Sequence, residues 1–331
     1  MKKNWKLLLC VAIISSMLLT SVFAANYPGI DKPDDDRTGH WVTLGKSVDD
    51  VENARDLGGY TANINGKEYV IKDKMLFRSG HLQNADVDAL RANNITKVID
   101  LRTSLEALRK PDVKDSKITN VPISMLTIPN LFVMESEDWR TLLGAIRSGI
   151  METWDTNLYR QYIQDPQAIK ATKQFFEEVV ASAKEGKAVL WHCTAGKDRT
   201  GIEAMLLMAA LGCDYSTILN EFLQTNVYYE EKAQASYDKV YKLIPIKAIA
   251  NEFYKYEIVR KTWLQDVSME VMKRETNTDN YEDALEAYLL NVIELDSADR
   301  EILRNAYLVG YESSIGVSDD RTQSLILESA A

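Results

Sequence analysis

The residues most suited to chemistry are a cysteine and an arginine six positions apart, Cys193 and Arg199. They lie in the segment HCTAGKDRTG, residues 192–201, between a predicted strand at 188–191 and a predicted helix at 199–211. The two side chains can face one bound phosphate only if the chain between them curls. In such a curl the backbone N–H groups point inward at phosphate oxygens, and the following helix adds the positive end of its dipole. The segment therefore predicts a phosphate-binding loop with a nucleophilic thiolate at its base.

Each residue type in this loop suits phosphate transfer. The start of a helix favours a thiolate at Cys193, since cysteines in such places commonly have pKa values of about 3.5–7.5, and a thiolate can attack phosphorus. Arg199 presents a planar fork that matches two phosphate oxygens, Gly196 lets the backbone approach closely, and the Thr200 hydroxyl can donate to the sulfur. A cysteine that only packs in the core is the alternative, but it leaves the surrounding pattern unexplained. We expect the phosphate to be bound by Thr194, Ala195, Gly196, Lys197, Asp198 and Arg199.

Two aspartates are candidates for the general acid that protonates the leaving group. Asp198 lies inside the loop, and its alternative role is to cap the helix. Asp100 ends a predicted strand, and ligands of open α/β sheets gather at the carboxyl ends of strands. The alternative role of Asp100 is an ion pair with Arg102 or Arg55. We favour Asp198 as the acid, with Asp100 as the alternative, because its place in a phosphate-facing loop is harder to explain otherwise.

The loop resembles the H-C-x-x-G-K-D-R-T-G pattern of the atypical bacterial protein tyrosine phosphatases, which are cysteine-dependent phosphatases, and matches it throughout. NARDLGG at 53–59, LFRS at 76–79 and VIDLRT at 98–103 resemble further motifs of that family, in the same order. The likeness runs from about Val51 to the C-terminal helices. It implies an α/β, protein-tyrosine-phosphatase-like fold, with a central mixed sheet flanked by helices and a helix-rich C-terminal half. It implicates both candidate aspartates without separating their roles.

Lys197 is an extra charge that bears on the substrate. In phosphatases of inositol lipids, a lysine at the corresponding loop position helps to bind additional phosphate groups. Lys197 therefore indicates phosphoinositides alongside phosphotyrosine, and a solvated charge at the rim is the equal alternative. The leading interpretation is a phosphatase of phosphorylated proteins, with tyrosine or dual specificity, that needs no metal and no cofactor. A phosphoinositide or inositol polyphosphate phosphatase is the nearest alternative.

An inactive module that only binds phosphorylated ligands is the alternative from another class. Such a module usually lacks the cysteine, the arginine or the aspartate, all of which are present here. A sulfur-transfer enzyme also uses a loop cysteine, but the GKDRT run at 196–200 has no explanation in that chemistry. Behind the pocket we expect His192 to orient the loop. We also expect an ion-pair scaffold there, formed by Arg55, Asp56, Arg78 and Arg102.

The first 24 residues are typical of a bacterial secretory signal peptide. Three lysines precede an apolar run at 7–23, and VFA at 22–24 resembles a cleavage site. A membrane anchor is the alternative, since the run is about as short as a spanning helix allows. We expect cleavage, a secreted or cell-envelope location and no stable membrane span in the mature protein.

Charge and cysteine content narrow the class of protein further. The net charge is −10, and the leader holds three lysines and no acid, so the mature chain would carry −13. That balance lacks the basic footprint of a nucleic-acid binder. Cys10 leaves with the leader, and the remaining pair, Cys193 and Cys213, is too small a set for a disulfide scaffold. A disulfide between these two stays open from spacing alone. With 46% hydrophobic residues, a sizeable core is feasible.

We expect a signal peptide at 1–24, an extended arm at 25–50, a single phosphatase domain at 51–312 and a loose tail at 313–331. Alternation around Asn65-Gly66 predicts a hairpin over 61–77. The other predicted elements are strands at 97–101 and 118–123, a helical pattern within 136–163, a helix from Pro166 to Gly186, and helices from 216 to about 308. The resemblance makes the tyrosine-rich segment 227–256 a candidate lid over the pocket, with core packing as the alternative.

Overall fold

The computed structural model describes residues 30–34, 40–126 and 151–312. The predicted leader, the helical pattern from Trp139 to Ile146 and the tail beyond 312 lie outside these residues. So does part of the predicted arm. The described end of that arm lies against the body, because the Val42 N–H donates to the Ala54 carbonyl at 3.1 Å. It includes a short 3₁₀ helix, η2 (Val48–Asp50).

A mixed sheet of five strands forms the centre of the protein, in the order β1-β4-β7-β5-β6. The edge strand β1 runs antiparallel to β4, and the remaining neighbours are parallel. In register, Ser79, His192, Asp100 and Pro122 lie side by side at the carboxyl ends of the parallel strands. Segments that follow these ends therefore meet at one edge of the sheet. The strands are β1 (Arg55–Asp56), β4 (Leu76–Ser79), β5 (Ile95–Asp100), β6 (Thr119–Pro122) and β7 (Ala188–His192).

The predicted hairpin is present but shorter than expected. It consists of β2 (Thr61–Ile64) and β3 (Lys67–Val70), joined by Asn65 and Gly66, which both have positive φ. The prediction was wrong at its C-terminal end, because Leu76 to Ser79 belong to the central sheet. All four residues of that strand are buried. An uninterrupted buried run is typical of a strand that is covered on both faces, and alternation is not.

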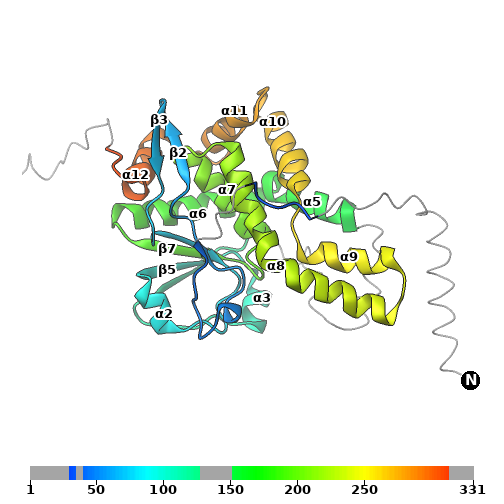
Figure 1. Cartoon of the computed structure of the whole chain (residues 1–331). Helices are drawn as coiled ribbons and strands as arrows, with labels where there is room; N and C mark the ends of the chain where they lie inside the picture. The colour runs from blue at the N-terminus through cyan, green and yellow to red at the C-terminus, as the bar shows by residue number, and fades with distance from the viewer. Residues whose placement is uncertain (1–29, 35–39, 127–150, 313–331) are drawn as a thin grey trace, which may run out of the picture.

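Helices cover both faces of the central sheet, as Figure 1 shows for α2 and α3 below it and α6 and α7 above it. The larger apolar cluster includes Leu76, Ile99 and Val189, on the α6 and α7 side. The smaller one includes Phe77 and Val98, the chain neighbours that point the other way. This alternation places the sheet between two cores. The helices are α2 (Val87–Ala92), α3 (Ser104–Arg109), α5 (Met151–Gln164), α6 (Pro166–Lys184) and α7 (Asp198–Leu211).

Helix α7 is the central helix of the molecule. It begins directly after the candidate loop and ends at Gly212, whose φ is 98°. Its residues are buried almost all round, as its apolar composition predicted. The helices predicted at 166–186 and 199–211 are thus confirmed to within a residue or two.

The C-terminal half is helical, as predicted. Helices α8 and α9 pack against each other and extend to the right of the sheet in Figure 1. The last helix returns to the body, where the Val309 N–H donates to the Val70 carbonyl at 2.8 Å. None of the helices in the described ranges is both long and apolar enough to cross a bilayer. The elements are α8 (Tyr215–Leu243), α9 (Lys247–Glu257), π-helical η4 (Trp263–Met269), α10 (Glu270–Thr276), α11 (Tyr281–Ala287), π-helical η5 (Tyr288–Val292) and α12 (Ser297–Tyr307).

Candidate active site

The strand, loop and helix predicted for the candidate site are present. Strand β7 ends at His192 and α7 begins at Asp198, so the loop lies at the carboxyl edge of the sheet. Gly196 has a φ of 65°, and a Cβ added there would lie 2.5 Å from the carbonyl carbon of Ser79. Both its conformation and this close approach require glycine. The loop is therefore packed tightly against the end of β4.

Cys193 lies at the base of this loop and is 2% exposed. Burial acts to raise its pKa, but the Arg199 charge and the hydroxyl and backbone N–H of Thr200 outweigh it and lower the pKa below the usual value. The Thr200 hydroxyl has no nitrogen or oxygen partner among the described residues. Cys213 differs, since burial raises its pKa strongly. Both cysteines are free.

Arg199 is held in a fork by a carboxylate that the sequence analysis missed. Its Nη1 donates to Glu106 Oε2 at 2.9 Å and its Nη2 to Glu106 Oε1 at 2.6 Å. The Thr194 hydroxyl donates to Glu106 Oε1 at 2.7 Å. Burial alone would raise the pKa of Glu106, but Arg199 and these hydrogen bonds lower it to about 2. Glu106 therefore stays ionised and fixes the plane of the guanidinium.

A local signal could have identified Glu106. Thr103 caps α3, and Glu106 occupies the third position of the helix. The backbone N–H and the hydroxyl of Thr103 both donate to Glu106 Oε2 at 2.9 Å. The T-x-x-E spacing is that of a capping box. The box alone would give Glu106 only a structural role, and tertiary packing adds the contact to Arg199.

The two candidate aspartates have different surroundings. Asp198 is half-buried at the start of α7, and the Tyr159 hydroxyl of α5 donates to its Oδ1 at 2.7 Å. Its charge acts against the Cys193 thiolate by raising the cysteine pKa. Asp100 instead accepts from Arg102 Nε and Nη2, each at 2.8 Å. The ion-pair alternative for Asp100 is therefore present in the structure, and Tyr159 is a contact of Asp198 that the sequence analysis missed.

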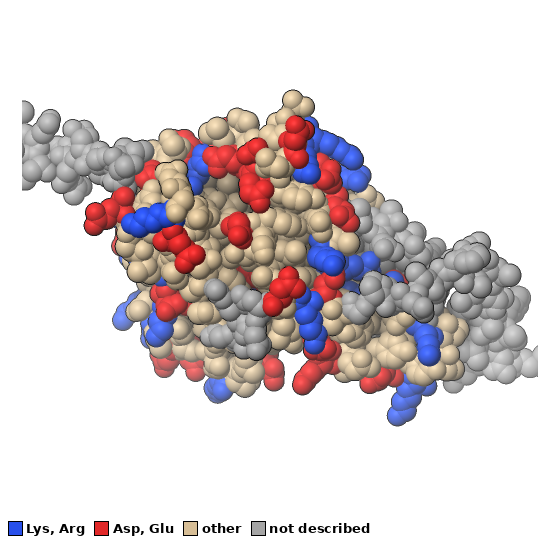
Figure 2. Space-filling view, turned by 45° about the horizontal axis from the view of Figure 1, so that its top comes forward, with Lys and Arg blue, Asp and Glu red and all other residues tan. Residues whose placement is uncertain are grey.

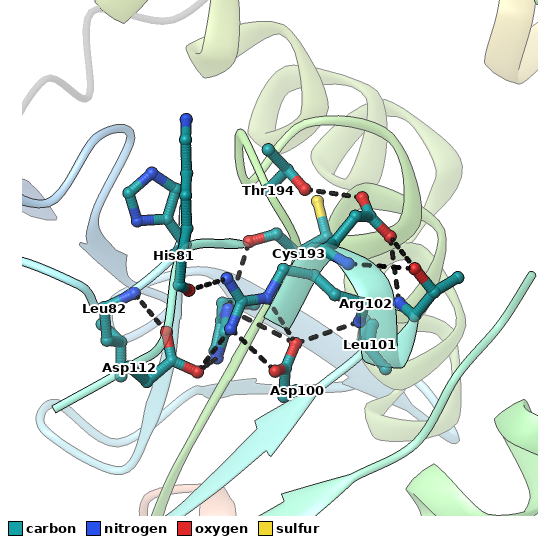
Figure 3. Close-up of polar contacts among 12 residues, drawn as sticks. His81, Leu82, Asp100, Leu101, Arg102, Asp112, Cys193 and Thr194 are labelled. Atoms are coloured by element: carbon teal, nitrogen blue, oxygen red, sulfur yellow. Dashed lines mark hydrogen bonds and ion pairs between the residues drawn. The ribbon is translucent and has the colours of Figure 1, made fainter. Parts of the chain in front are cut away.

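A charged network lies beneath the loop, at the ends of the strands (Figure 3). Arg102 Nη2 also donates to Asp112 Oδ2 at 2.7 Å. His192 Nε2 lies 3.2 Å from Asp112 Oδ2, and its Nδ1 lies 3.1 Å from the Cys193 carbonyl. Burial acts to lower the pKa of His192, but Asp100 and Asp112 outweigh it and raise the pKa. His192 thus contacts the loop from behind, as expected. His192 and the two aspartates lie close enough together to bind a metal ion, but the guanidinium of Arg102 already contacts both carboxylates.

The predicted ion-pair scaffold is present with a different acid. Arg55 Nε donates to Glu221 Oε1 at 2.7 Å, and Arg78 Nη1 donates to Glu221 Oε2 at 2.6 Å. Arg78 Nη2 also donates to the Gly196 carbonyl at 2.7 Å. Asp56 takes no part in this scaffold, since its carboxylate accepts from the backbone N–H groups of Gly58 and Lys74. Glu221 comes from α8, which carries no local motif that would reveal it.

Lys197 is buried, so the alternative of a solvated rim charge is wrong. Its ammonium donates to the Tyr256 carbonyl at 2.6 Å and lies 5.3 Å from the centre of that ring. The Tyr229 hydroxyl donates to the Ala195 carbonyl at 2.8 Å. The tyrosine-rich segment thus forms much of α8 and α9 and contacts the loop at two points. Lys197 and Tyr256 tie the end of α9 to the loop.

Figure 2 shows acidic and basic side chains interspersed over one face of the molecule, with uncharged surface between them. No extended basic patch is visible on that face among the described residues. The strong positive charges of the site are local ones within the loop and its supports.

Comparison with known proteins agrees with the geometry. A model of the tyrosine phosphatase family matches residues 46–309. A Cupriavidus necator protein, whose name assigns it as a tyrosine-protein phosphatase, is 28% identical over 267 residues, which cover 80% of this chain and 88% of that protein. A tyrosine-protein phosphatase of Nostoc commune is 32% identical over 159 residues, covering 47% of this chain and 49% of its own. The triple specificity protein phosphatase PtpB of Mycobacterium tuberculosis is 30% identical over 176 residues, which cover 46% of this chain and 60% of that protein.

The mixed sheet, the loop at its carboxyl edge and these matches define a phosphoric monoester hydrolase of the protein-tyrosine-phosphatase type. The chain belongs to the tyrosine phosphatase family.

Proposed function

We propose that this protein is a secreted phosphatase that hydrolyses phosphate monoesters through a phosphocysteine intermediate, with phosphotyrosine proteins as its main substrates and dual specificity. The observation that carries the proposal is the pairing of a buried cysteine of lowered pKa with an arginine held in a fork by Glu106. A thiolate and a fixed guanidinium at one loop provide the nucleophile and the charge stabilisation that the reaction needs.

In the first step, the Cys193 thiolate attacks phosphorus and forms the S–P bond, while the bond from phosphorus to the leaving oxygen breaks. Asp198 gives its proton to that oxygen. Arg199 and the N–H groups of the loop stabilise the charge on the remaining phosphate oxygens. In the second step, Asp198 takes a proton from water, which attacks phosphorus, and the S–P bond breaks. Thr200 supports the departing thiolate by donating its hydroxyl.

Asp198 is the better candidate for the acid because its carboxylate is not enclosed by an ion pair. Asp100 has both oxygens engaged by Arg102 and lies beneath the loop. A carboxylate whose two oxygens both face one guanidinium has no oxygen directed at a leaving group. The Tyr159 hydroxyl donates to Asp198 Oδ1 and fixes the position of the carboxylate. Oδ2 has no donor among the described residues and can face the leaving group.

Specificity beyond phosphotyrosine is supported by one relative, which is named a triple specificity phosphatase. The phosphoinositide alternative depends on Lys197, whose ammonium faces the Tyr256 carbonyl. To bind a phosphate group, the Lys197 ammonium would have to give up its hydrogen bond to the Tyr256 carbonyl. Export is supported only by the leader pattern of residues 1–24.

A substrate panel tests the proposal. We expect phosphotyrosine peptides to give the highest kcat/KM, followed by phosphoserine and phosphothreonine peptides, phosphoinositides and phytate. Cys193→Ser should abolish turnover of all of them while still binding phosphate, and a chelator should leave the wild-type rate unchanged. Turnover by Cys193→Ser, or a ranking led by phytate, would contradict the proposal.

A further inference from the structure

The arm segment 30–34 lies between α8 and the segment that follows α9. The Asp31 carbonyl accepts from Nδ2 of Asn226, a residue of α8, at 2.7 Å. Asp31 Oδ2 accepts the backbone N–H of Lys261, four residues past the end of α9, at 3.1 Å. Asp31 therefore joins two elements that are far from it in the chain, and the proposed chemistry uses neither contact.

Asn226 is a buried amide whose two N–H donors are both in use. Its side chain is 0% exposed. Nδ2 donates to the Asp31 carbonyl and, at 2.9 Å, to the Val259 carbonyl, while Oδ1 accepts the Val259 N–H at 2.7 Å. An asparagine has two N–H donors, so the arm takes the one that Val259 leaves free. Without the arm, this buried N–H would lose its partner, which is unfavourable.

The same face of α8 contacts the phosphate-binding loop. Tyr229 lies three positions after Asn226 and therefore on the same face of the helix. Its hydroxyl donates to the Ala195 carbonyl of the loop at 2.8 Å. The arm thus binds α8 within one turn of a residue that contacts the loop.

Val259 connects Asn226 to the second contact between the helices and the loop. Three positions before Val259, the Tyr256 carbonyl accepts from the Lys197 ammonium at 2.6 Å. Val259 is 0% exposed and exchanges two hydrogen bonds with Asn226, so the segment after α9 is fixed against α8. The position of the Tyr256 carbonyl therefore depends on Asn226, and Asn226 depends on the arm.

We propose that Asp31 and Asn226 are positioning residues for the phosphate-binding loop. The arm fixes the end of α9 against α8, and the Tyr256 carbonyl then holds Lys197 and the loop backbone beside it in the conformation that binds phosphate. The inference rests on the proposed function of the loop. Neither residue touches the substrate, and their effect is on how firmly the loop N–H groups are placed before the reaction.

Variants of the two residues test the proposal by steady-state kinetics with p-nitrophenyl phosphate. Asn226→Ala should lower kcat about tenfold, less than the roughly 100-fold that a displacement of about 1 Å can cost. Asp31→Ala should act in the same direction. Asp31→Asn keeps an oxygen that can accept the Lys261 N–H, so kcat should stay within about twofold of wild type. Lys32→Met is the control, because its exposed ion pair with Glu230 contributes little.

A double-mutant cycle shows whether the arm acts through Lys197. Lys197→Met removes the contact with the Tyr256 carbonyl and should itself lower kcat. Adding Asn226→Ala or Asp31→Ala to Lys197→Met should then cause no further loss, since residues that act through one contact are not additive. Losses that multiply, or wild-type kcat in both single variants, would overturn the proposal. Asp31→Ala leaves the buried amide bonded, so the cycle can be completed even where Asn226→Ala does not fold.

Hydrogen exchange separates this inference from the proposed function. In Cys193→Ser, adding Asn226→Ala should speed the exchange of backbone amides at 256–261 and at 195–199, and adding Lys32→Met should not. Unchanged exchange at 195–199 would refute the positioning role even in an active phosphatase. If the wild type hydrolysed no phosphate ester, the proposed function would fail, and the exchange rates would still decide whether the arm orders the loop.

Discussion

At the scale of single residues, the contact between Arg199 and Glu106 matters most for the proposed chemistry. Two hydrogen bonds of 2.6 and 2.9 Å hold the guanidinium, and the Thr194 hydroxyl ties the same carboxylate to the loop. A guanidinium held in this way needs little rearrangement when charge develops on the phosphate oxygens. Glu106 is therefore a positioning residue rather than a catalytic one.

Replacing Glu106 with Gln keeps the shape of the side chain but removes its charge and one acceptor. Because Arg199 then keeps only one acceptor and meets an amide NH2 group in place of the other, its guanidinium is less firmly fixed. We expect kcat/KM for p-nitrophenyl phosphate to fall about 100-fold, mainly through kcat. Steady-state kinetics with a parallel thermal melt measures both effects. Glu231→Gln, at an exposed position, is the matched control. Wild-type kcat in a folded Glu106→Gln protein would show that Arg199 needs no such support.

Asp198→Asn removes the proposed acid. The loss should be about 10²–10⁴-fold for poor leaving groups and much smaller for good ones, because a good leaving group needs no proton. A series of aryl phosphates of graded leaving-group pKa measures this dependence. Tyr159→Phe should give a weaker loss of the same kind, since it removes only the hydrogen bond to Asp198 Oδ1. Equal losses across the series would move the acid role to Asp100 or elsewhere.

At the scale of elements, the packing of α6 against α7 buries a carboxylate that the chemistry does not use. Glu203 on α7 is fully buried and accepts from the Thr172 hydroxyl of α6 at 2.8 Å. Its Oε2 has no partner among the described residues. Burial raises the pKa of Glu203 to about 8, opposed only weakly by this one hydrogen bond. The group is therefore protonated in the folded state at neutral pH.

This raised pKa makes the stability depend on pH in a definite direction. Between the usual pKa of 4.5 and about 8, the folded state binds the proton and the unfolded state does not. The contribution of Glu203 is thus fully present below the unfolded pKa and decreases as pH rises, by about 1.4 kcal/mol per pH unit. The Gln side chain of Glu203→Gln cannot ionise. The free energy of unfolding of this variant, relative to that of the wild type, should therefore increase as pH rises from 5.5 to 7.5. Urea unfolding at the two pH values measures the difference, and a constant difference would contradict the buried protonated state.

At the scale of the whole molecule, a single sheet edge collects contacts from distant parts of the chain. Arg78 from β4, Glu106 from α3, Tyr159 from α5 and Glu221 from α8 all reach the loop or its direct partners. The site therefore depends on the complete fold rather than on one motif. A change that loosens α8 should disturb the loop, because Glu221 pairs with the two arginines behind it.

The leader gives a prediction about the mature protein. Expressed in a bacterial host with an export pathway, the chain should lose residues 1–24 and begin at Ala25. Mass spectrometry of the purified protein tests this, and a leader that remains attached in a membrane fraction would favour the anchor alternative. Cleavage would also leave Cys193 and Cys213 as the remaining cysteines. We expect both to react as free thiols after denaturation, as the structure has them.

Much of this protein could be predicted from local patterns. The loop, the helix after it, the strands that end at Asp100 and His192, and the helical C-terminal half depend on contiguous residue types, and each was found where expected. The motif also indicates Cys193 and Arg199, because their types and spacing suit phosphate chemistry in any fold that curls the loop.

The contacts that these residues make with their partners were decided by the tertiary structure, although a capping box marks Glu106 locally. Glu106 lies 93 positions from Arg199, and Tyr159 lies 39 positions from Asp198. Glu221 lies 143 positions from Arg78, and no local period brings any of these pairs together. Lys197 shows the same limit, since only the fold buries its ammonium against the end of α9. The spacing of residues in the sequence predicts which side chains of one element can act together. Side chains of separate elements meet only because the sheet places the carboxyl ends of its parallel strands side by side.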